Sequence, residues 1–353
     1  MDAFRGLAVF GMLLVNNKAL GPWTPAQLTH AGWNQGIHLA DLVYPWFLLI
    51  VGVAIPYSEA SARGRGVSRW GYALKVVHRA AILVLLGCLI NSSYARHPMF
   101  DLGVLQLIGF AYLAGALLYG LPLAGRLLVA AELLAAHWVL LRFLPVPGAG
   151  VGALGPSQNP IAYLNQTYLG QWELENVPAV LPTAALVVIG TAIGDGLRSR
   201  WGSERRKVGL LLAGGLALAL AGWLWSLDLP LNKRLWTGPF ILFAAGWGAM
   251  VLGAVHFLTE VKRHRRWVFP LQVMGVNAIT AFVLPMLVNI HVLREWGWRG
   301  AEGAFLSLQQ HWLGLFTGHA GAGLGGLLYT TSYLLAWWLV LFYLYRKRIY
   351  LRV

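Results

Sequence analysis

Residues 30 to 47 place titratable side chains at the start of a long apolar run. His30 lies 11 residues before Asp41, and His38 lies three residues before it. An imidazole titrates near neutral pH, so it can accept a proton as a general base or attack an acyl group as a nucleophile. A carboxylate in the first turn of a helix is stabilised by the helix dipole and can orient a nearby imidazole, either His30 or His38. Because titratable groups beside hydrocarbon are costly, they predict a functional site; the alternative is a set of interfacial residues that cap a helix.

Two asparagines could complete such a site. Asn16 lies in the first apolar run, and Asn34 lies four residues after His30. The amide N–H groups of both side chains can donate to a carbonyl oxygen as negative charge builds on it. The alternative for Asn16 is a hydrogen bond between helices. The alternative for Asp41 is a structural cap or an ion pair with Lys18.

Composition predicts the elements that must position these side chains. Hydrophobic residues make up 58% of the 353 residues and charged residues 11%, whereas soluble domains are about one quarter charged. Apolar runs that suit a hydrocarbon core of about 30 Å cover residues 4–20, 38–58, 80–93, 103–121, 127–145, 178–196, 208–227, 237–257, 271–290 and 324–345. We therefore predict an all-α fold, a polytopic integral membrane helical bundle of about ten transmembrane helices, built as a single domain over residues 1–353.

The distribution of lysine and arginine predicts how the helices are oriented. With a cytoplasmic N-terminus, 20 of the 27 Lys and Arg residues fall in inner segments and seven in outer ones, which is the bias that membrane proteins show. Both termini are therefore predicted to be cytoplasmic. Basic inner loops face anionic headgroups, so the net charge of +14 indicates membrane lipids as partners and no nucleic acid.

Cysteine usage excludes one class of site. Cys88 is the single cysteine, so the chain can form neither an intrachain disulfide nor a cysteine-based metal cluster. We expect no metal. The first apolar run follows no basic segment and precedes no small-residue cleavage site, so we expect it to remain as a helix rather than to be removed.

Short motifs along the whole chain carry a family resemblance. They are DAFRGL at 2–7, MLLVN at 12–16, HAGWN at 30–34, ADLVYPWF at 40–47, GVAIP at 52–56, GVLQ at 103–106, LNKRLWT at 231–237, GVNA at 275–278 and YRKRI at 345–349. In this order they resemble the transmembrane catalytic domain of the heparan-α-glucosaminide N-acetyltransferase family, in a bacterial-type form without the extra N-terminal soluble portion of the animal enzymes. The chain departs from the family at Phe100 and Leu107, where an arginine is usual.

The resemblance implies a transmembrane acyltransferase domain that uses acetyl-CoA as co-substrate. The acetyl group would be taken on the cytoplasmic side and delivered to a glucosamine-type amino sugar on the outer face. The resemblance places the catalytic histidine at His30 and matches the family's asparagine at Asn16. A charge in mid-bilayer costs several kcal/mol, so the CoA phosphates should stay inside while the neutral acyl group crosses. Arg5 and Asn16 are 11 residues apart, or about 17 Å along a helix, so the first helix would link the two ends.

Two further groups of residues are candidates for binding the donor and the acceptor. The basic residues expected to hold the CoA phosphates are Arg5, Arg69, Lys75, Arg79 and Arg266, since guanidinium and ammonium groups match phosphate oxygens. The alternative is that such residues only set topology. The residues expected to contact the sugar are Trp33, His38, Asn232, Lys233, Trp236 and Asn277, although Trp also marks ordinary membrane interfaces. The outer segments 146–177 and 291–323 are expected to form a rim that faces the acceptor.

A second class of function uses the same residues differently. In a proton-coupled transporter of a small solute or lipid-linked sugar, Asp41, His30 and Arg5 would form the proton path. For the enzyme, the amino sugar could belong to a peptidoglycan fragment, a lipid-linked glycan or a free sugar. Apolar helix faces suit lipid and a second copy of the chain alike, so a homo-oligomer is a further expected partner. The expected location is the bacterial cytoplasmic (inner) membrane.

Overall fold

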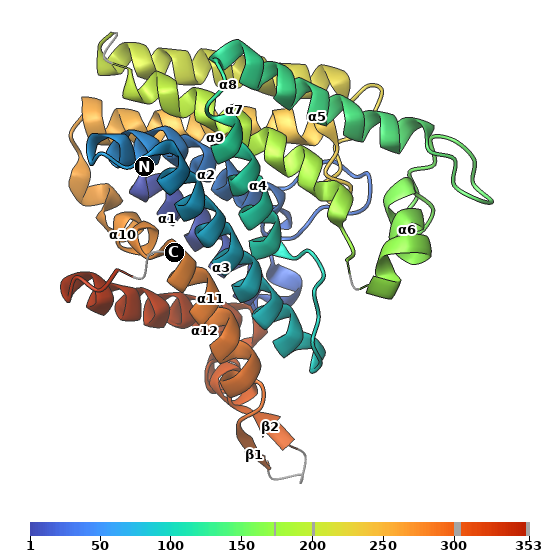
Figure 1. The fold of residues 1–353 in the computed structure, drawn as a ribbon. Coiled ribbons are helices and arrows are strands. Elements are labelled where there is room, and N and C mark those ends of the chain that lie inside the picture. The colour runs from blue at the N-terminus through green and yellow to red at the C-terminus, as the bar shows by residue number, and fades with distance from the viewer. Residues whose placement is uncertain (173, 200–201, 300–304, 351–353) are drawn as a thin grey trace.

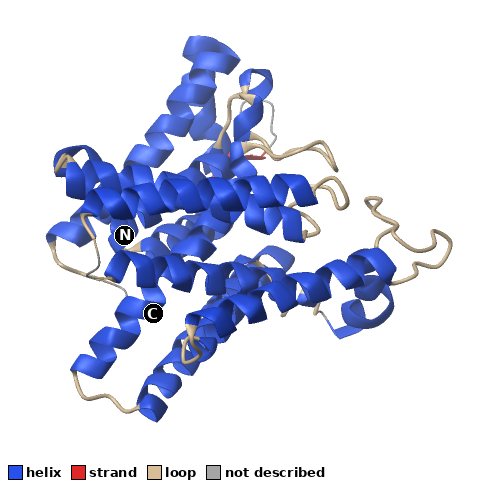
Figure 2. Ribbon diagram, turned by 90° about the horizontal axis from the view of Figure 1, so that it is seen from above, coloured by secondary structure: helices blue, strands red, loops and turns tan. Residues whose placement is uncertain are grey.

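The structure is a computed structural model that describes residues 1–172, 174–199, 202–299 and 305–350. The described chain is almost entirely helical, with one short two-stranded hairpin (Figure 2). The α-helices are α1 Asp2–Asn17, α2 Leu39–Gly64, α3 Arg69–Ala95, α4 Val104–Leu118, α5 Leu123–Phe143, α6 Pro160–Leu164, α7 Val180–Arg198, α8 Glu204–Trp225, α9 Gly238–His256, α10 Arg265–Val276, α11 Ala278–Val288 and α12 Leu308–Arg346. Shorter 3-10 and π turns are η1 Gly21–Trp23, η2 Ala26–Leu28, η3 Asn165–Leu169, η4 Gly170–Trp172, η5 Val177–Ala179, η6 Phe257–Val261 and η7 Asn289–Leu293. The antiparallel hairpin pairs β1 Gly297–Arg299 with β2 Phe305–Ser307.

The predicted all-α membrane fold is confirmed; nine of the ten apolar runs each fall on one helix, and the run 271–290 falls on the bent pair α10 and α11. By length and composition, seven helices among the described residues are candidate membrane spans: α2, α3, α5, α8, α7 with its preceding turn, α9 with its following turn, and α12. The pair α10 and α11 with η7, bent by 65°, makes an eighth if it counts as one span. Helices α1 and α4 have 16 and 15 residues, or about 24 and 22 Å, which is shorter than a hydrocarbon core of about 30 Å. The count of ten crossing helices and the cytoplasmic termini stay predictions.

Two of the predicted helices have a different course. The run 271–290, expected as one helix, is broken at Asn277, whose φ of −112° and ψ of 43° are not helical. The run 324–345 begins earlier, at Leu308, and the helix α12 is kinked at Gly321, where φ is 73°. Such a positive φ is accessible to glycine without steric cost. The apolar run 271–290 crosses Asn277 without interruption, so it does not reveal that break.

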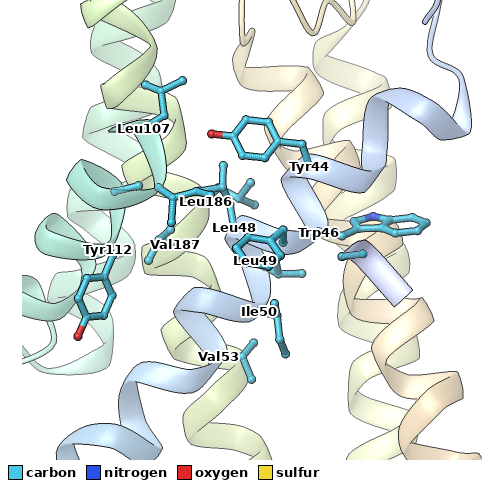
Figure 3. Close-up of a cluster of buried hydrophobic side chains, with 14 of the residues drawn as sticks. Tyr44, Trp46, Leu48, Leu49, Ile50, Val53, Leu107, Tyr112, Leu186 and Val187 are labelled. Atoms are coloured by element: carbon cyan, nitrogen blue, oxygen red, sulfur yellow. The ribbon is translucent and has the colours of Figure 1, made fainter. Parts of the chain in front are cut away.

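The centre of the bundle is the contact between α2 and α7. A side-chain carbon on Gly52 of α2 would lie 2.1 Å from the carbonyl oxygen of Val187, and one on Gly190 of α7 would lie 2.4 Å from that of Leu49. Small residues at such positions let membrane helices pack backbone to backbone. Around this contact Leu48, Leu49, Ile50, Val53, Leu186 and Val187 form a cluster of buried apolar side chains (Figure 3).

The remaining helices surround this centre. Helices α1 to α4 lie between a layer of α5, α7, α8 and α9 on one side and α10 to α12 on the other (Figure 1). Helix α1 packs on α10 through another glycine pair. A side-chain carbon on Gly6 would lie 1.8 Å from the carbonyl oxygen of Leu271, and one on Gly275 would lie 1.8 Å from that of Asp2. The first helix is therefore held against the α10–α11 break at its N-terminal end.

We expect Gly275→Ala to destabilise the fold, because the added methyl group would overlap the α1 backbone and force α1 and α10 apart. Overpacking of this kind costs about 1 to 3 kcal/mol, and the thermal unfolding temperature in detergent should fall. The matched control is Gly214→Ala in α8, where a side-chain carbon meets nothing within 4 Å. That variant should be as stable as the parent or more stable, since alanine favours a helix over glycine by about 1 kcal/mol. Equal unfolding temperatures for Gly275→Ala and the parent would contradict the tight α1–α10 contact.

Candidate functional site

Asp41 organises the segment that precedes α2. It is the third residue of that helix, and its side chain is 3% exposed. One carboxylate oxygen, Oδ2, accepts hydrogen bonds from the backbone N–H groups of Ala31 and His38, both at 3.1 Å. The other, Oδ1, lies 2.8 Å from Nδ1 of His30. The carboxylate therefore folds residues 30–38 around the N-terminus of α2 and holds one of the two candidate imidazoles.

The contacts distinguish the two histidines. Nδ1 of His38 lies 3.0 Å from the carbonyl oxygen of Thr29, so this ring is tied to the backbone rather than to Asp41. His30, with its side chain 46% exposed, is the imidazole that meets the carboxylate. Because a carboxylate only accepts, Nδ1 of His30 carries the hydrogen in this contact, and Nε2 is left to accept a proton.

Lys233 completes the cluster and was expected only as a sugar contact. Its Nζ lies 3.6 Å from Oδ1 of Asp41 and 3.2 Å from Nδ1 of His30. The cation beside Asp41 is thus Lys233 and not Lys18, whose Nζ donates to the carbonyl oxygen of Val15 at 2.8 Å. Burial lowers the pKa of the Lys233 ammonium, and the Asp41 carboxylate opposes that shift. A partly desolvated ammonium beside a carboxylate balances the charge that Asp41 brings into the protein.

A first cavity of about 580 Å³ opens beside this cluster. The predicted site residues that line it are Asn16, His30, Trp33, Asn34, Asp41, Asn232, Lys233 and Trp236. They come from α1, from the segment before α2, from the start of α2 and from residues 226–237 between α8 and α9. The tertiary structure therefore brings together eight of the residues singled out at widely separated sequence positions.

Within the first cavity, the asparagines do different things. The Asn34 backbone is left-handed with φ 55°, and its Oδ1 accepts from Nδ2 of Asn232 at 2.8 Å. Nε1 of Trp33 donates to the carbonyl oxygen of Leu154 at 2.7 Å. These bonds join the segments around residues 34, 154 and 232. Asn16 is exposed to the cavity at the end of α1, where its amide can reach a bound molecule.

A second cavity of about 400 Å³ lies toward the other end of α1 and is mostly apolar. Arg5, Arg79 and Asp2 line it together with Ser58. Nη1 of Arg5 contacts Oδ1 of Asp2 at 3.1 Å and the carbonyl oxygen of Gly275 at 3.3 Å. The wall beside Gly275 is formed by the broken end of α10 and the start of α11.

A third hollow of about 280 Å³ adjoins the second and is lined by more basic side chains than the second. The two share Ser58, Arg79 and Tyr112. Lys75 lines the third hollow, as do Arg65 and His78, which were not singled out for this role. Of the five predicted phosphate contacts, Arg5, Lys75 and Arg79 are thus brought to one region. Arg69 and Arg266 are exposed near the starts of α3 and α10 and line none of these three hollows.

The first and second cavities lie next to each other inside the bundle. Met12 of α1, Val104 of α4 and Phe282 of α11 line both of them. The two cavities therefore follow one another along α1, with Arg5 and Arg79 bordering the second and His30 and Asp41 bordering the first. Its two ends correspond to the inner and outer ends that the charge distribution predicts.

Two predicted sugar contacts lie elsewhere. His38 does not line the first cavity. Asn277 is buried at the α10–α11 break, and its Nδ2 donates to the carbonyl oxygen of Ile349 at 3.0 Å. Its neighbours Val276 and Ala278 line the second cavity, so Asn277 lies at the Arg5 end of the molecule.

Sequence reasoning missed several polar residues of the first cavity. Asn17, Tyr94, Asn176, Asn289 and Arg294 line it as well. The signal for Asn289 is its place in an otherwise apolar run, since a buried Asn in a membrane segment needs a partner. Asn176 and Arg294 belong to the two long outer segments expected to form a rim. Among the described residues, no group of three or more His, Cys, Asp and Glu could hold a metal ion.

The chain is similar in sequence to known proteins. Residues 1–223 match the family described as heparan-alpha-glucosaminide N-acetyltransferase, catalytic. The chain is similar to heparan-alpha-glucosaminide N-acetyltransferase of Homo sapiens, with 26% identity over 349 residues that cover 80% of this chain and 52% of the human protein. It is also similar to the protein of that name from Mus musculus, with 33% identity over 184 residues, 44% of this chain and 27% of the mouse protein. The chain thus spans about half the length of the human relative, and its match to the mouse relative covers 27% of that protein.

We expect Asp41→Ala to destabilise the protein, because it leaves the N–H groups of Ala31 and His38 and the Lys233 ammonium without their acceptor. Breaking a buried charge pair costs on the order of 3 kcal/mol, which should appear as a lower unfolding temperature in detergent. Glu260→Ala is the matched control, since it removes an exposed partner 3.5 Å from Arg265 and such pairs contribute less than about 1 kcal/mol. Similar unfolding temperatures for the two variants would show that Asp41 does not organise this end.

Proposed function

The chain belongs to the heparan-alpha-glucosaminide N-acetyltransferase family, and from this premise we propose that it moves an acetyl group from acetyl-CoA to the amine of a glucosamine-type sugar across the membrane. The observation that carries the proposal is the pair of adjacent cavities inside the bundle, one bordered by arginines and the other by His30 and Asp41. A reaction between a highly charged donor and an outer acceptor needs such a divided site, because the donor's phosphates cannot enter hydrocarbon.

The donor end suits the parts of acetyl-CoA. The second cavity has an apolar wall that fits the uncharged arm of the cofactor. The adjoining third hollow carries Arg65, Lys75, His78 and Arg79. Phosphate oxygens accept charge-assisted hydrogen bonds from such side chains, and Arg5 stands at the border of the second cavity. The thioester would then point along α1 toward Met12.

The acceptor end suits deprotonation of an amine. As the amine nitrogen attacks the thioester carbon, the new C–N bond forms, the C–S bond breaks and CoA leaves as a thiolate. Nε2 of His30 takes the proton that the amine loses, and this proton is finally returned to the thiolate, so that an amide and a free thiol result. Asp41 stabilises the imidazolium that forms on His30, as the carboxylate does in a hydrolase triad. In this proposal, the side-chain amide of Asn16 donates a hydrogen bond to the oxyanion.

The same imidazole can also carry the acetyl group in two steps. His30 would first attack the thioester carbon, release CoA, and then pass the acetyl group to the amine. Mass spectrometry of the enzyme incubated with acetyl-CoA alone distinguishes the two routes, since only the second leaves an acetylated protein. A proton-coupled transporter finds no specific support in the cavities, because the arginine end and the His30 end differ in chemistry as a two-substrate reaction requires.

The sidedness of the reaction follows from the predicted topology. With both termini cytoplasmic, the Arg5 end faces the cytoplasm, where acetyl-CoA is made, and the first cavity faces outward. We propose the bacterial cytoplasmic membrane as the location and an amino sugar or glycan outside it as the acceptor. Cationic rim residues Lys233, Arg234 and Arg294 border the first cavity.

We expect purified wild-type protein in detergent to transfer label from acetyl-CoA to at least one amino sugar of a glucosamine-based panel and to release free CoA. His30→Ala should lower the rate by at least about 100-fold, the usual contribution of a general base. His319→Ala, which removes an exposed imidazole bonded to the carbonyl oxygen of Leu315, should retain the wild-type rate. Failure of the wild type to acetylate any acceptor would refute the activity, and full activity of His30→Ala would refute the role of that residue.

We expect Arg79→Ala to raise the KM for acetyl-CoA by about 10-fold or more, with a smaller effect on kcat, because a lost contact to a charged group costs about 1.5 to 3 kcal/mol. Arg5→Ala should act in the same direction. Arg63→Ala is the control, since Arg63 is exposed at the end of α2, pairs with Glu59 and lines none of the three hollows. Steady-state kinetics with varied donor measures the effect, and an equal KM for Arg79→Ala and Arg63→Ala would exclude a phosphate contact at Arg79.

A further inference from the structure

The few side chains that lie between the two cavities are apolar. Of the described residues, Met12, Val104 and Phe282 are those that line both cavities. They belong to α1, α4 and α11, which are far apart in the sequence. Met12 and Phe282 are each 7% exposed, so both are held within the bundle. Anything that passes from the second cavity to the first must pass these three side chains.

The backbone at this point is anchored. Val104 is the first residue of α4, and its carbonyl oxygen accepts a hydrogen bond from the Tyr44 hydroxyl at 3.0 Å. Tyr44 in turn packs edge to face against Trp236, with ring centroids 5.3 Å apart. Of the three side chains, methionine is flexible and fills irregular gaps, whereas phenylalanine is rigid. Of the side chains between the two cavities, Met12 is therefore the one that can most readily adapt its shape.

The chemistry of the three side chains decides what can occupy the opening. An apolar opening offers no partner to a charged or hydrogen-bonding group, so a phosphate or a sugar hydroxyl there would lose hydration without compensation. A small neutral acyl group loses little. During the attack, the carbonyl carbon must lie where the amine can reach it from the first cavity, and the rest of the acyl chain must lie beside Met12, Val104 and Phe282.

We propose that Met12, Val104 and Phe282 form an acyl-selecting constriction, which admits the two-carbon acetyl group and excludes longer acyl chains. This inference rests on the proposed transfer from a CoA thioester, and it names the residues that set the donor class. The reaction balances in the same way for any acyl group, since the acyl carbon exchanges its bond to sulfur for one to nitrogen. Only the space for the carbon chain differs, and one methylene in an apolar pocket is worth about 1 to 3 kcal/mol, or roughly 10- to 200-fold.

The test compares acetyl-, propionyl- and butyryl-CoA as donors to one amino sugar that the wild type acetylates. The ratio of kcat/KM for butyryl-CoA to that for acetyl-CoA should rise by at least about 10-fold in Met12→Ala, because the constriction is enlarged. Val104→Leu should move the propionyl-to-acetyl ratio in the opposite direction, because it narrows the opening. The ratio is internal to each variant, so a lower yield of folded protein does not alter it.

Leu14→Ala is the matched control, since Leu14 lies two residues beyond Met12 on α1 and lines neither cavity. Its donor ratios should equal those of the wild type. Unchanged ratios in both Met12→Ala and Val104→Leu would overturn the constriction while leaving acetyl transfer itself intact. Absence of acetyl transfer in the wild type would instead refute the proposed function, so the two failures are distinguishable.

Discussion

Asp41 is a carboxylate with almost no solvent exposure, and it is the third residue of an apolar helix. The residues around it that line the first cavity are held in place by its contacts. It accepts from two backbone N–H groups, contacts His30 and lies beside Lys233. An ionised group in that position persists only if it is paired and hydrogen-bonded. The same contacts that stabilise the carboxylate also set the tautomer of His30. The Asp41 carboxylate therefore both stabilises this end of the molecule and sets the protonated nitrogen of His30.

Close helix packing places the first cavity in line with the second cavity. The glycine contacts between α2 and α7 and between α1 and α10 bring backbones together, which leaves the bulky side chains to surround the cavities rather than to separate the helices. Helix α1 then lines both cavities, from Arg5 at one end to Asn16 at the other. The break at Asn277 also shapes this region, because α11 begins directly after it and brings Phe282 between the two cavities.

The two positions where this chain lacks an arginine that is usual in the family differ in their surroundings. Leu107, at a position where the family usually has arginine, lines the first cavity as an apolar wall. Phe100 is exposed outside the helices, in the segment between α3 and α4. The cations that border the second and third hollows are Arg5 of α1, Arg65 directly after α2, and Lys75 and Arg79 of α3. The positive charge expected for a phosphate ligand is thus supplied by other elements of the same bundle.

The sequence by itself determined the fold class, because apolar runs and a low charge content leave helices as the solution for a chain in hydrocarbon. It also pointed to His30 and Asp41, since titratable groups beside an apolar run stand out locally. Only the tertiary structure decided that Lys233, about 190 residues later, is the cation at Asp41 and that Asn277 lies at the Arg5 end. It also decided that Arg69 and Arg266 line none of the three hollows described above. These facts depend on which helix faces contact each other and on where helices break. Hydrophobic periodicity does not indicate either, because lipid-facing and protein-facing surfaces are equally apolar.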